Sequence, residues 1–262
     1  IIRSDSKISS LKKILLRTSK NFSLILSSKD FFICCTDFIR SYPIFYLKDK
    51  NLIYISNSNK TLEKLSKNVN LDSVYQCISA GFVTEENTIF DKIKCLGAGK
   101  LIAKYYNNSS LYHETYFKFN STIKKKKNSK IQLEDELYNV LDVIFEDLIE
   151  KSNGNQIVIP LSGGLDSRLI LSKLLEKKYD NIFTFSYGLK NNSDAFIAKE
   201  IAQKLHVKWE FIEFNKDLYR KYYISDFKKK YDQYSDNSSV LPNYQDIFFI
   251  NELKQKKMIN KN

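Results

Sequence analysis

Two adjacent glycines stand within a segment whose residue types suit phosphate binding, Pro160-Leu161-Ser162-Gly163-Gly164-Leu165-Asp166-Ser167. Glycine is otherwise rare, with 7 in the whole chain. Because glycine has no Cβ, neighbouring backbone N–H groups can turn toward a bound anion. A helix that begins just after the glycines adds partial positive charge in the same direction. The segment therefore predicts a phosphate-binding loop.

Three polar side chains accompany the glycines. Ser162 and Ser167 offer hydroxyl donors to a phosphate. Asp166 would repel a phosphate directly, so we expect it to hold a Mg²⁺ ion that bridges to one. A simpler interpretation is a serine-capped helix after a tight turn, but a cap needs only one Ser or Asp. We favour the phosphate site because a cap does not explain the paired glycines and the second serine.

The elements around this loop alternate between strand and helix. A short apolar run, Gln156–Leu161, leads into the loop, and a helical pattern follows it. Further strands are predicted at Ile182–Tyr187 and Val207–Phe214, with a helix at Asp194–Leu205 between them. Strands separated by helices pair in parallel through right-handed crossovers. A ligand of such a sheet lies at the carboxyl ends of its strands, which is where the loop begins.

The first half of the chain is richer in strands. A helix is predicted at Leu71–Ala80, and Gly81 is expected to end it. Two further helices are predicted, one over the amphipathic stretch from Leu133 to Leu148 and one at Pro242–Met258. The polar segment 120–130 contains four consecutive lysines, Lys124–Lys127, and is predicted to be a linker. We therefore divide the chain into domains 1–128 and 129–262. Strand-like runs are Phe22–Ser27, Phe31–Thr36, Ile44–Leu47, Leu52–Ile55, Leu101–Tyr106 and Leu111–Phe119.

The formal net charge of +12 suggests nucleic-acid binding, but its distribution argues against it. Residues 1–130 carry 23 Lys and Arg against 10 Asp and Glu, whereas residues 131–262 carry 19 against 20. Only 5 of the 42 basic residues are arginine, the usual reader of bases and phosphates. The basic surplus thus lies outside the half that carries the phosphate loop.

Cysteine usage and hydropathy point to a reducing, aqueous compartment. The four cysteines, Cys34, Cys35, Cys77 and Cys95, form no Cys-x-x-Cys pair, so a zinc site is unsupported. No run approaches the roughly 20 apolar residues of a membrane helix, and no secretory signal is evident. We expect a cytoplasmic location and no membrane partner.

The Ser-Gly-Gly-x-Asp-Ser signature resembles the pyrophosphate loop of the N-type ATP pyrophosphatases. Such enzymes split ATP between its α and β phosphates and transfer AMP to a substrate oxygen. The stretch from Pro160 through Thr184-Phe185-Ser186-Tyr187-Gly188 further resembles asparagine synthetase. The resemblance implies that Ser162, Gly163, Gly164 and Ser167 hold pyrophosphate, that Asp166 holds Mg²⁺, and that Leu161 and Tyr187 meet adenine through their backbone.

The resemblance extends to both sides of the loop. Asp37–Tyr46, Gly81–Val83 and residues 89–99 resemble the glutaminase domain of the same family, and Ser238–Pro242 resembles the entry to its second nucleotide loop. The implied fold class is α/β and α+β. An incomplete, β-rich glutaminase-like domain precedes a doubly wound parallel-sheet ATP pyrophosphatase domain of the adenine nucleotide alpha hydrolase type. Arg168 and the Arg-Ser-x-Pro form resemble members encoded in bacterial surface-polysaccharide clusters.

Two departures from the family limit what can be expected. The glutaminase nucleophile is an N-terminal cysteine, whereas residue 1 here is Ile1, so we expect no glutamine hydrolysis. No glycine follows Gly188, so the family's later Gly-rich loop is missing and the chain reads as truncated at both ends. We assign no catalytic residue. Arg168 is expected to contact a phosphate or solvent, and Asp194 to cap a helix.

The leading hypothesis is an ATP-dependent amide ligase of the glutamine-hydrolysing asparagine synthetase class, with ATP and Mg²⁺ as cofactors. Its acceptor would be a small-molecule carboxylate, aspartate by analogy. The alternatives are a non-catalytic nucleotide-binding or polysaccharide-cluster protein, and an RNA-modifying ATP pyrophosphatase. The acceptor, the ammonia source and a homodimeric state are left open.

Overall fold

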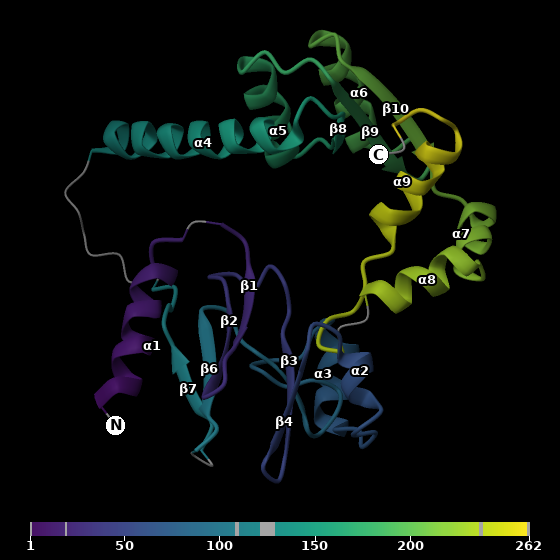
Figure 1. The fold of residues 1–262 in the computed structure, drawn as a ribbon. Coiled ribbons are helices and arrows are strands. Elements are labelled where there is room, and N and C mark those ends of the chain that lie inside the picture. The colour runs from purple at the N-terminus through teal and green to yellow at the C-terminus, as the bar shows by residue number, and fades with distance from the viewer. Residues whose placement is uncertain (1, 19, 108–109, 121–128, 236–237, 261–262) are drawn as a thin grey trace. The chain divides into compact units, whose positions relative to one another are not determined.

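The computed structural model describes residues 2–18, 20–107, 110–120, 129–235 and 238–260 (Figure 1). The chain divides into two compact units. The first unit comprises Ile1–Thr122 with Asp232–Pro242, and the second comprises Ile123–Tyr231 with Asn243–Asn262. The predicted linker around Lys124–Lys127 lies outside the described residues.

The first unit is built on two antiparallel sheets. One has the strand order β1-β2-β6-β7 and the other β4-β3-β5. The strands are β1 Ser23–Ser27, β2 Phe31–Thr36, β3 Phe45–Asp49, β4 Leu52–Ser56, β5 Ile93–Cys95, β6 Lys100–Tyr105 and β7 Tyr112–Thr115. The helices of this unit are α1 Ile2–Leu15, α2 Asn59–Glu63 and α3 Leu71–Ala80. The predicted strand-rich character of this half is confirmed.

Alternation along β2 shows how the sheets are covered. Ile33 and Cys35 pack in a cluster with Leu15 of α1. Phe32 and Cys34, on the opposite face of the same strand, pack in a cluster that includes Tyr46 of β3. Since side chains alternate between the faces of a strand, this sheet is buried against a helix on one side and against the second sheet on the other. Helix α1, which sequence analysis did not predict, supplies the outer cover.

The segment 232–242 joins the first unit through backbone pairing. The Val83 N–H donates to the Ser239 carbonyl at 2.7 Å, and the Leu241 N–H donates to the Gly81 carbonyl at 2.8 Å. Sequence reasoning had placed this segment within domain 129–262. The pairing also explains why α9, Gln245–Gln255, begins later than the helix predicted from Pro242. Gly81 ends α3 with φ of 81°, as predicted for a glycine in the left-handed region.

The second unit is an α/β sheet. Its strands β8 Ile157–Pro160, β9 Ile182–Gly188 and β10 Lys208–Glu213 run parallel in the order β10-β9-β8. The helices that accompany them are α4 Lys130–Ser152, α5 Leu165–Glu176, α6 Ser193–Lys204, α7 Lys216–Tyr223, α8 Asp226–Ser235 and α9. The predicted alternation of strand and helix, with parallel pairing, is confirmed.

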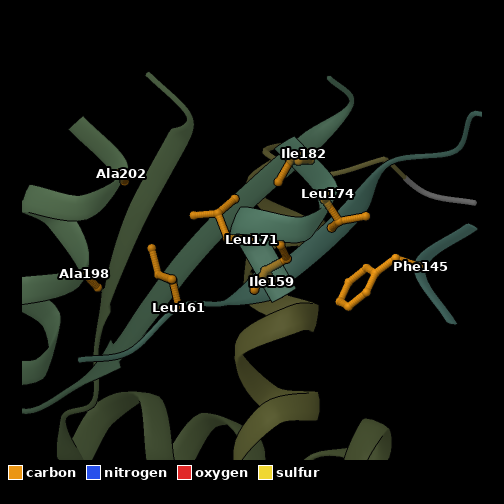
Figure 2. Packing of buried hydrophobic residues seen from close by; sticks show 8 residues of the cluster. All are labelled: Phe145, Ile159, Leu161, Leu171, Leu174, Ile182, Ala198 and Ala202. Atoms are coloured by element: carbon orange, nitrogen blue, oxygen red, sulfur yellow. The ribbon is translucent and has the colours of Figure 1, made fainter. Parts of the chain in front are cut away.

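Helices pack on both faces of this sheet. On one face Ile159 and Ile182 meet side chains from α4, α5 and α6 (Figure 2). On the other, Phe183 and Phe185 of β9 pack with Phe249 of α9. Burying each such side chain stabilises the fold by about 1.5–3 kcal/mol. The two-sided burial explains why β8 is apolar throughout and why the polar residues of β9, Thr184 and Ser186, are small.

A buried ion pair sets the position of α5, the helix that begins at the candidate loop. The ammonium group of Lys173, whose side chain is only 3% exposed, donates to Asp142 of α4 at 2.6 Å and to Glu176 at 3.0 Å. It also lies 3.7 Å from the centre of the Tyr138 ring. A buried charge is tolerated when it is paired and hydrogen-bonded in this way.

Among the described residues no helix is both long and apolar enough to cross a membrane.

Candidate functional site

The glycine-rich loop lies at the carboxyl end of β8, as predicted. β8 ends at Pro160 and α5 begins at Leu165, so residues 161–164 make the whole connection. The Leu161 N–H donates to the Phe185 carbonyl at 2.7 Å and so extends the pairing with β9 by one residue. Leu161 is 2% exposed. The start of the loop is thus anchored in the core, and the rest emerges at the edge of the sheet.

The two serines bond to the loop itself. The Ser162 N–H donates to Ser167 Oγ at 3.1 Å, and the two hydroxyls lie 3.1 Å apart. The Gly164 N–H donates to Ser162 Oγ, also at 3.1 Å. The structure therefore brings together the two serines and the two glycines that the sequence singled out. In this conformation the two hydroxyls link the start of the loop, at Ser162, to the first turn of α5, at Ser167.

The N-terminus of α5 lacks a side-chain cap. Its N-cap residue is Gly164, which has no side chain to accept from the first turn. By contrast Ser129, Asn192 and Asn215 cap α4, α6 and α7 with their side chains. The first N–H groups of a helix have no partner within the helix. The first turn of α5 therefore presents N–H donors suited to an anion.

Arg168 orients the peptide groups of the loop. Its Nη2 donates to the Gly163 carbonyl at 2.9 Å and its Nε to the Gly164 carbonyl at 3.0 Å. In a trans peptide the N–H points opposite to the C=O, so the Leu165 N–H is directed away from the guanidinium. Arg168 is partly exposed, and its predicted contact with a phosphate stays a prediction. Arg168 holds the loop carbonyls on its own side.

Asp194 lies against the loop, and its predicted role as a helix cap is wrong. The cap of α6 is Asn192, whose Oδ1 accepts from the N–H groups of Asp194 at 2.8 Å and Ala195 at 3.3 Å. A Cβ placed on Gly163 would come within 2.7 Å of Asp194 Oδ1. A side chain at position 163 would therefore displace the Asp194 carboxylate from the loop. Sequence reasoning missed this contact because Asn192 and Asp194 are both good capping residues.

A hydrogen-bond relay supports the loop from beneath. Ser186 Oγ, in β9, donates to the Leu161 carbonyl at 2.6 Å. The same oxygen accepts from Trp209 Nε1, in β10, at 3.0 Å. Ser186 is only 6% exposed. The relay links all three strands to the first residue of the loop.

The Tyr187 side chain is held against α9. Its hydroxyl donates to Asp246 at 2.8 Å, and its ring stacks on Phe249 with centres 4.1 Å apart. Burial, together with the acceptor Asp246, raises the Tyr187 pKa to about 12, so the hydroxyl stays protonated. Its side chain is thus turned toward α9. The adenine contact implied by the family resemblance would involve its backbone at the end of β9.

The acidic groups at the loop suit a cation shared with phosphates. Asp166 is exposed on the first turn of α5, and Asp194 lies at Gly163. Within the described ranges no three or more His, Cys, Asp or Glu residues form a group that could hold a metal. Mg²⁺ in nucleotide sites takes one or two carboxylates, with substrate phosphates and water completing its shell. Two acids beside an open phosphate loop fit that requirement.

The cysteines do not supply a nucleophile. Cys34, Cys35, Cys77 and Cys95 are all free and buried. Burial raises the pKa of both Cys34 and Cys35 to about 12. Since the thiolate is the reactive form, these thiols are inert in the folded protein.

The second unit matches a known family. Residues 154–255 match the family model described as asparagine synthase, a range that includes the loop, all three parallel strands and α9. A search of curated proteins finds no match to the chain. Residues 154–255 are thus similar to an asparagine synthase domain, and this similarity suggests the ATP pyrophosphatase fold for the parallel sheet.

Proposed function

We propose that this asparagine synthase domain binds Mg²⁺–ATP at the loop after β8 and transfers AMP to a carboxylate that is then amidated. The family match suggests an ATP-dependent ligase. The observation that carries the proposal is the N-terminus of α5, which has no side-chain cap and follows directly on the Ser-Gly-Gly segment of this chain. Open N–H groups at a helix start favour phosphate oxygens.

Each site residue has a role in this proposal. Gly163, Gly164 and the first turn of α5 would bind the pyrophosphate portion through N–H groups, and Ser162 and Ser167 would add hydroxyls. Such oriented donors stabilise charge as it develops on the phosphates. The backbone of Leu161 and Tyr187 would border the adenine.

Asp166 and Asp194 are the carboxylates available for Mg²⁺. When bound, the ion would neutralise phosphate charge during transfer. Asp194 joins Asp166 in this proposal because its carboxylate lies at the first glycine of the loop. A cation held by only these two acids would require the nucleotide as a third partner, which predicts mutual dependence of Mg²⁺ and ATP binding.

We propose that the amidating nitrogen does not come from glutamine hydrolysis by this chain. All four cysteines are buried, and burial raises the pKa of Cys34 and Cys35, which are consecutive in β2, to about 12. The first unit retains a folded two-sheet core, so we propose a glutaminase-like scaffold in which none of these four cysteines is the nucleophile. Family analogy alone would suggest aspartate as the acceptor, and no contact in the described site selects it.

A non-catalytic, nucleotide-binding role is the second candidate. It is the alternative because the described loop offers groups that can bind a nucleotide, Ser162, Ser167 and the first turn of α5, but no residue to which we assign a catalytic role. RNA modification is disfavoured because residues 131–262 carry 19 basic against 20 acidic residues. We also propose a cytoplasmic location, which agrees with four free cysteines.

Calorimetry with ATP at fixed Mg²⁺ tests the proposal. We expect saturable heat that disappears when Mg²⁺ is chelated, and a loss of affinity of at least about tenfold in Asp166→Ala, as for a lost charge-assisted contact. Asp180→Ala is the matched control, since Asp180 is an exposed acid at the far end of α5. If the folded Asp166→Ala variant binds as the parent does, the metal assignment is wrong.

Carboxylate-dependent exchange of labelled pyrophosphate into ATP separates the two candidates. Adenylation predicts exchange with a suitable carboxylate present. ATP binding without exchange across a panel of carboxylates would support the non-catalytic role.

A further inference from the structure

A cavity of about 730 Å³ opens beyond the carboxyl ends of β9 and β10. Its walls come from the residues that follow β9, the end of β10 and the first turns of α7. Pockets of roughly 300–1,000 Å³ are typical of drug-sized ligands. This cavity is therefore much larger than aspartate would need, and no residue assigned to the nucleotide lines it.

The cavity is positively charged. Lys190, Lys216 and Arg220 line it, against a single acid, Glu213. None of these three cations takes part in an ion pair with any other residue in the described part of the chain. Lys221, their neighbour on α7, shows the contrast, because it is paired with Glu252 at 2.9 Å. The unpaired cations of the cavity suit an anionic ligand.

The rest of the lining is apolar and partly open to solvent. Leu189 is 69% exposed and Tyr219 is 44% exposed, while Phe214 is half-buried. The Phe214 and Tyr219 rings meet edge to face, with centres 6.1 Å apart. Aromatic and aliphatic walls with a few charged groups are typical of small-molecule sites. The lining therefore fits a ligand with an apolar body as well as negative charge.

The cavity and the phosphate loop share one edge of the sheet. The loop follows β8, the cavity borders β9 and β10, and β9 is the central strand. Neighbouring strands are about 4.8 Å apart, so the ends of β8 and β10 are separated by roughly 10 Å. A ligand in the cavity can extend over the end of β9 toward the loop.

We propose that this cavity binds the acceptor substrate, and that the acceptor is a dianion with an apolar body rather than aspartate. The inference rests on the proposed function, since it assigns the acceptor of that reaction. One carboxylate would reach the loop and be activated there. The second anionic group, a carboxylate or a phosphate, would be bound by Lys216 and Arg220, and the body would lie against Phe214 and Tyr219.

Energy transfer offers a probe that reports on this cavity. Trp209 is the only tryptophan of the chain and lies four positions before Glu213 on β10, about 13 Å away at 3.3 Å per residue. The aromatic anion 8-anilinonaphthalene-1-sulfonate accepts tryptophan emission and has the apolar body and one of the two negative charges inferred for the ligand. Binding in the cavity should quench Trp209 and produce sensitised probe emission.

Variants and competitors then test the assignment. The Lys216→Gln/Arg220→Gln double variant should weaken probe binding at least about tenfold, since two charge-assisted contacts are lost. The control Lys199→Gln/Lys204→Gln removes two exposed lysines of α6 and should change it less than about twofold. Naphthalene-2,6-dicarboxylate should displace the probe at lower concentration than 2-naphthoate, and aspartate should not displace it. A direct comparison of the dicarboxylate with a naphthalene that carries one carboxylate and one phosphate identifies which second anionic group the cavity prefers.

Three outcomes would overturn the proposal: equal probe binding by the parent and the cavity double variant, displacement by aspartate at the concentration of the dicarboxylate, or displacement by Mg²⁺–ATP. The last would make the cavity part of the nucleotide site. Failure of the proposed function has a different signature, because the dicarboxylate would still bind but calorimetry would detect no ATP. Asp166→Ala should lose ATP and retain the dicarboxylate.

Discussion

Replacing Ser186 with alanine removes one hydroxyl on which the base of the phosphate loop depends. Ser186 Oγ donates to the Leu161 carbonyl at 2.6 Å and accepts from Trp209 Nε1 at 3.0 Å. Alanine leaves both partners without this contact in a region where Leu161 is 2% exposed. Water has little access to replace the lost oxygen.

The magnitude follows from the two orphaned groups. A buried polar group that loses its partner costs about 1–3 kcal/mol. Because the Trp209 indole is only partly buried, its share lies at the low end, and we expect a total of about 2–4 kcal/mol. With a urea dependence of about 2 kcal/mol per molar, the middle of the usual range, the unfolding midpoint should fall by roughly 1–2 M.

Urea unfolding followed by tryptophan emission is the appropriate assay. Trp209 is the only tryptophan, so its signal reports on the second unit alone. Ser186→Thr keeps the hydroxyl and suits a strand, so it should recover most of the stability. Ser172→Ala is the control, because Ser172 is exposed on α5 and alanine there is neutral or slightly stabilising.

A loss of less than about 0.5 kcal/mol in Ser186→Ala, similar to a neutral surface substitution, would refute the reasoning. It would mean that the Leu161 carbonyl and the indole find other partners. An equal loss in Ser186→Thr would show that packing, and not the hydroxyl, determines the stability.

Three further expectations concern the loop, the first unit and its cysteines. Gly163→Ala should weaken ATP binding while the unit stays folded, because the new Cβ would lie 2.7 Å from Asp194 Oδ1; unchanged calorimetric affinity would argue against the loop geometry. Burial by itself raises the Asp37 pKa, but N–H donors from Ser41, Phe22 and Ile39 lower it below its ordinary 3.8. The stabilisation by ionised Asp37 is therefore complete above pH 3.8 and is lost as the pH falls through the lower pKa of the folded state. Asp37→Asn should destabilise the first unit at pH 7 and make its stability depend less on pH in acid. Amide hydrogen exchange measures both effects. Iodoacetamide and a glutamine-analogue alkylator should leave Cys34 and Cys35 unmodified until urea unfolds the first unit, and a stoichiometric adduct in the native protein, detected by mass spectrometry, would contradict their burial.

Much of the second unit follows from local patterns in the sequence. The strand Ile182–Gly188 is an apolar run long enough for one buried strand, and the helix over Lys130–Ser152 has the period of an amphipathic helix. The paired glycines lie between a predicted strand and a predicted helix, and the structure places them there. Helical period, strand alternation and turn chemistry depend on residues within a few positions of one another. The loop and its edge of the sheet could therefore be predicted without coordinates.

Tertiary structure decided which distant residues meet at that loop. Asn192 and Asp194 are equally suitable caps by type, and only the packing of α6 against β9 and β10 showed that Asp194 lies at the loop. The Trp209–Ser186 relay depends on the parallel register of β9 and β10, and residues 232–242 join the first unit through backbone bonds that carry no side-chain signal. Contacts between residues far apart in sequence depend on the packing of whole elements, and a one-residue change of register would turn a strand's side chains to the other face. The sequence by itself determined the chemistry available at the loop, and the fold determined which side chains support it.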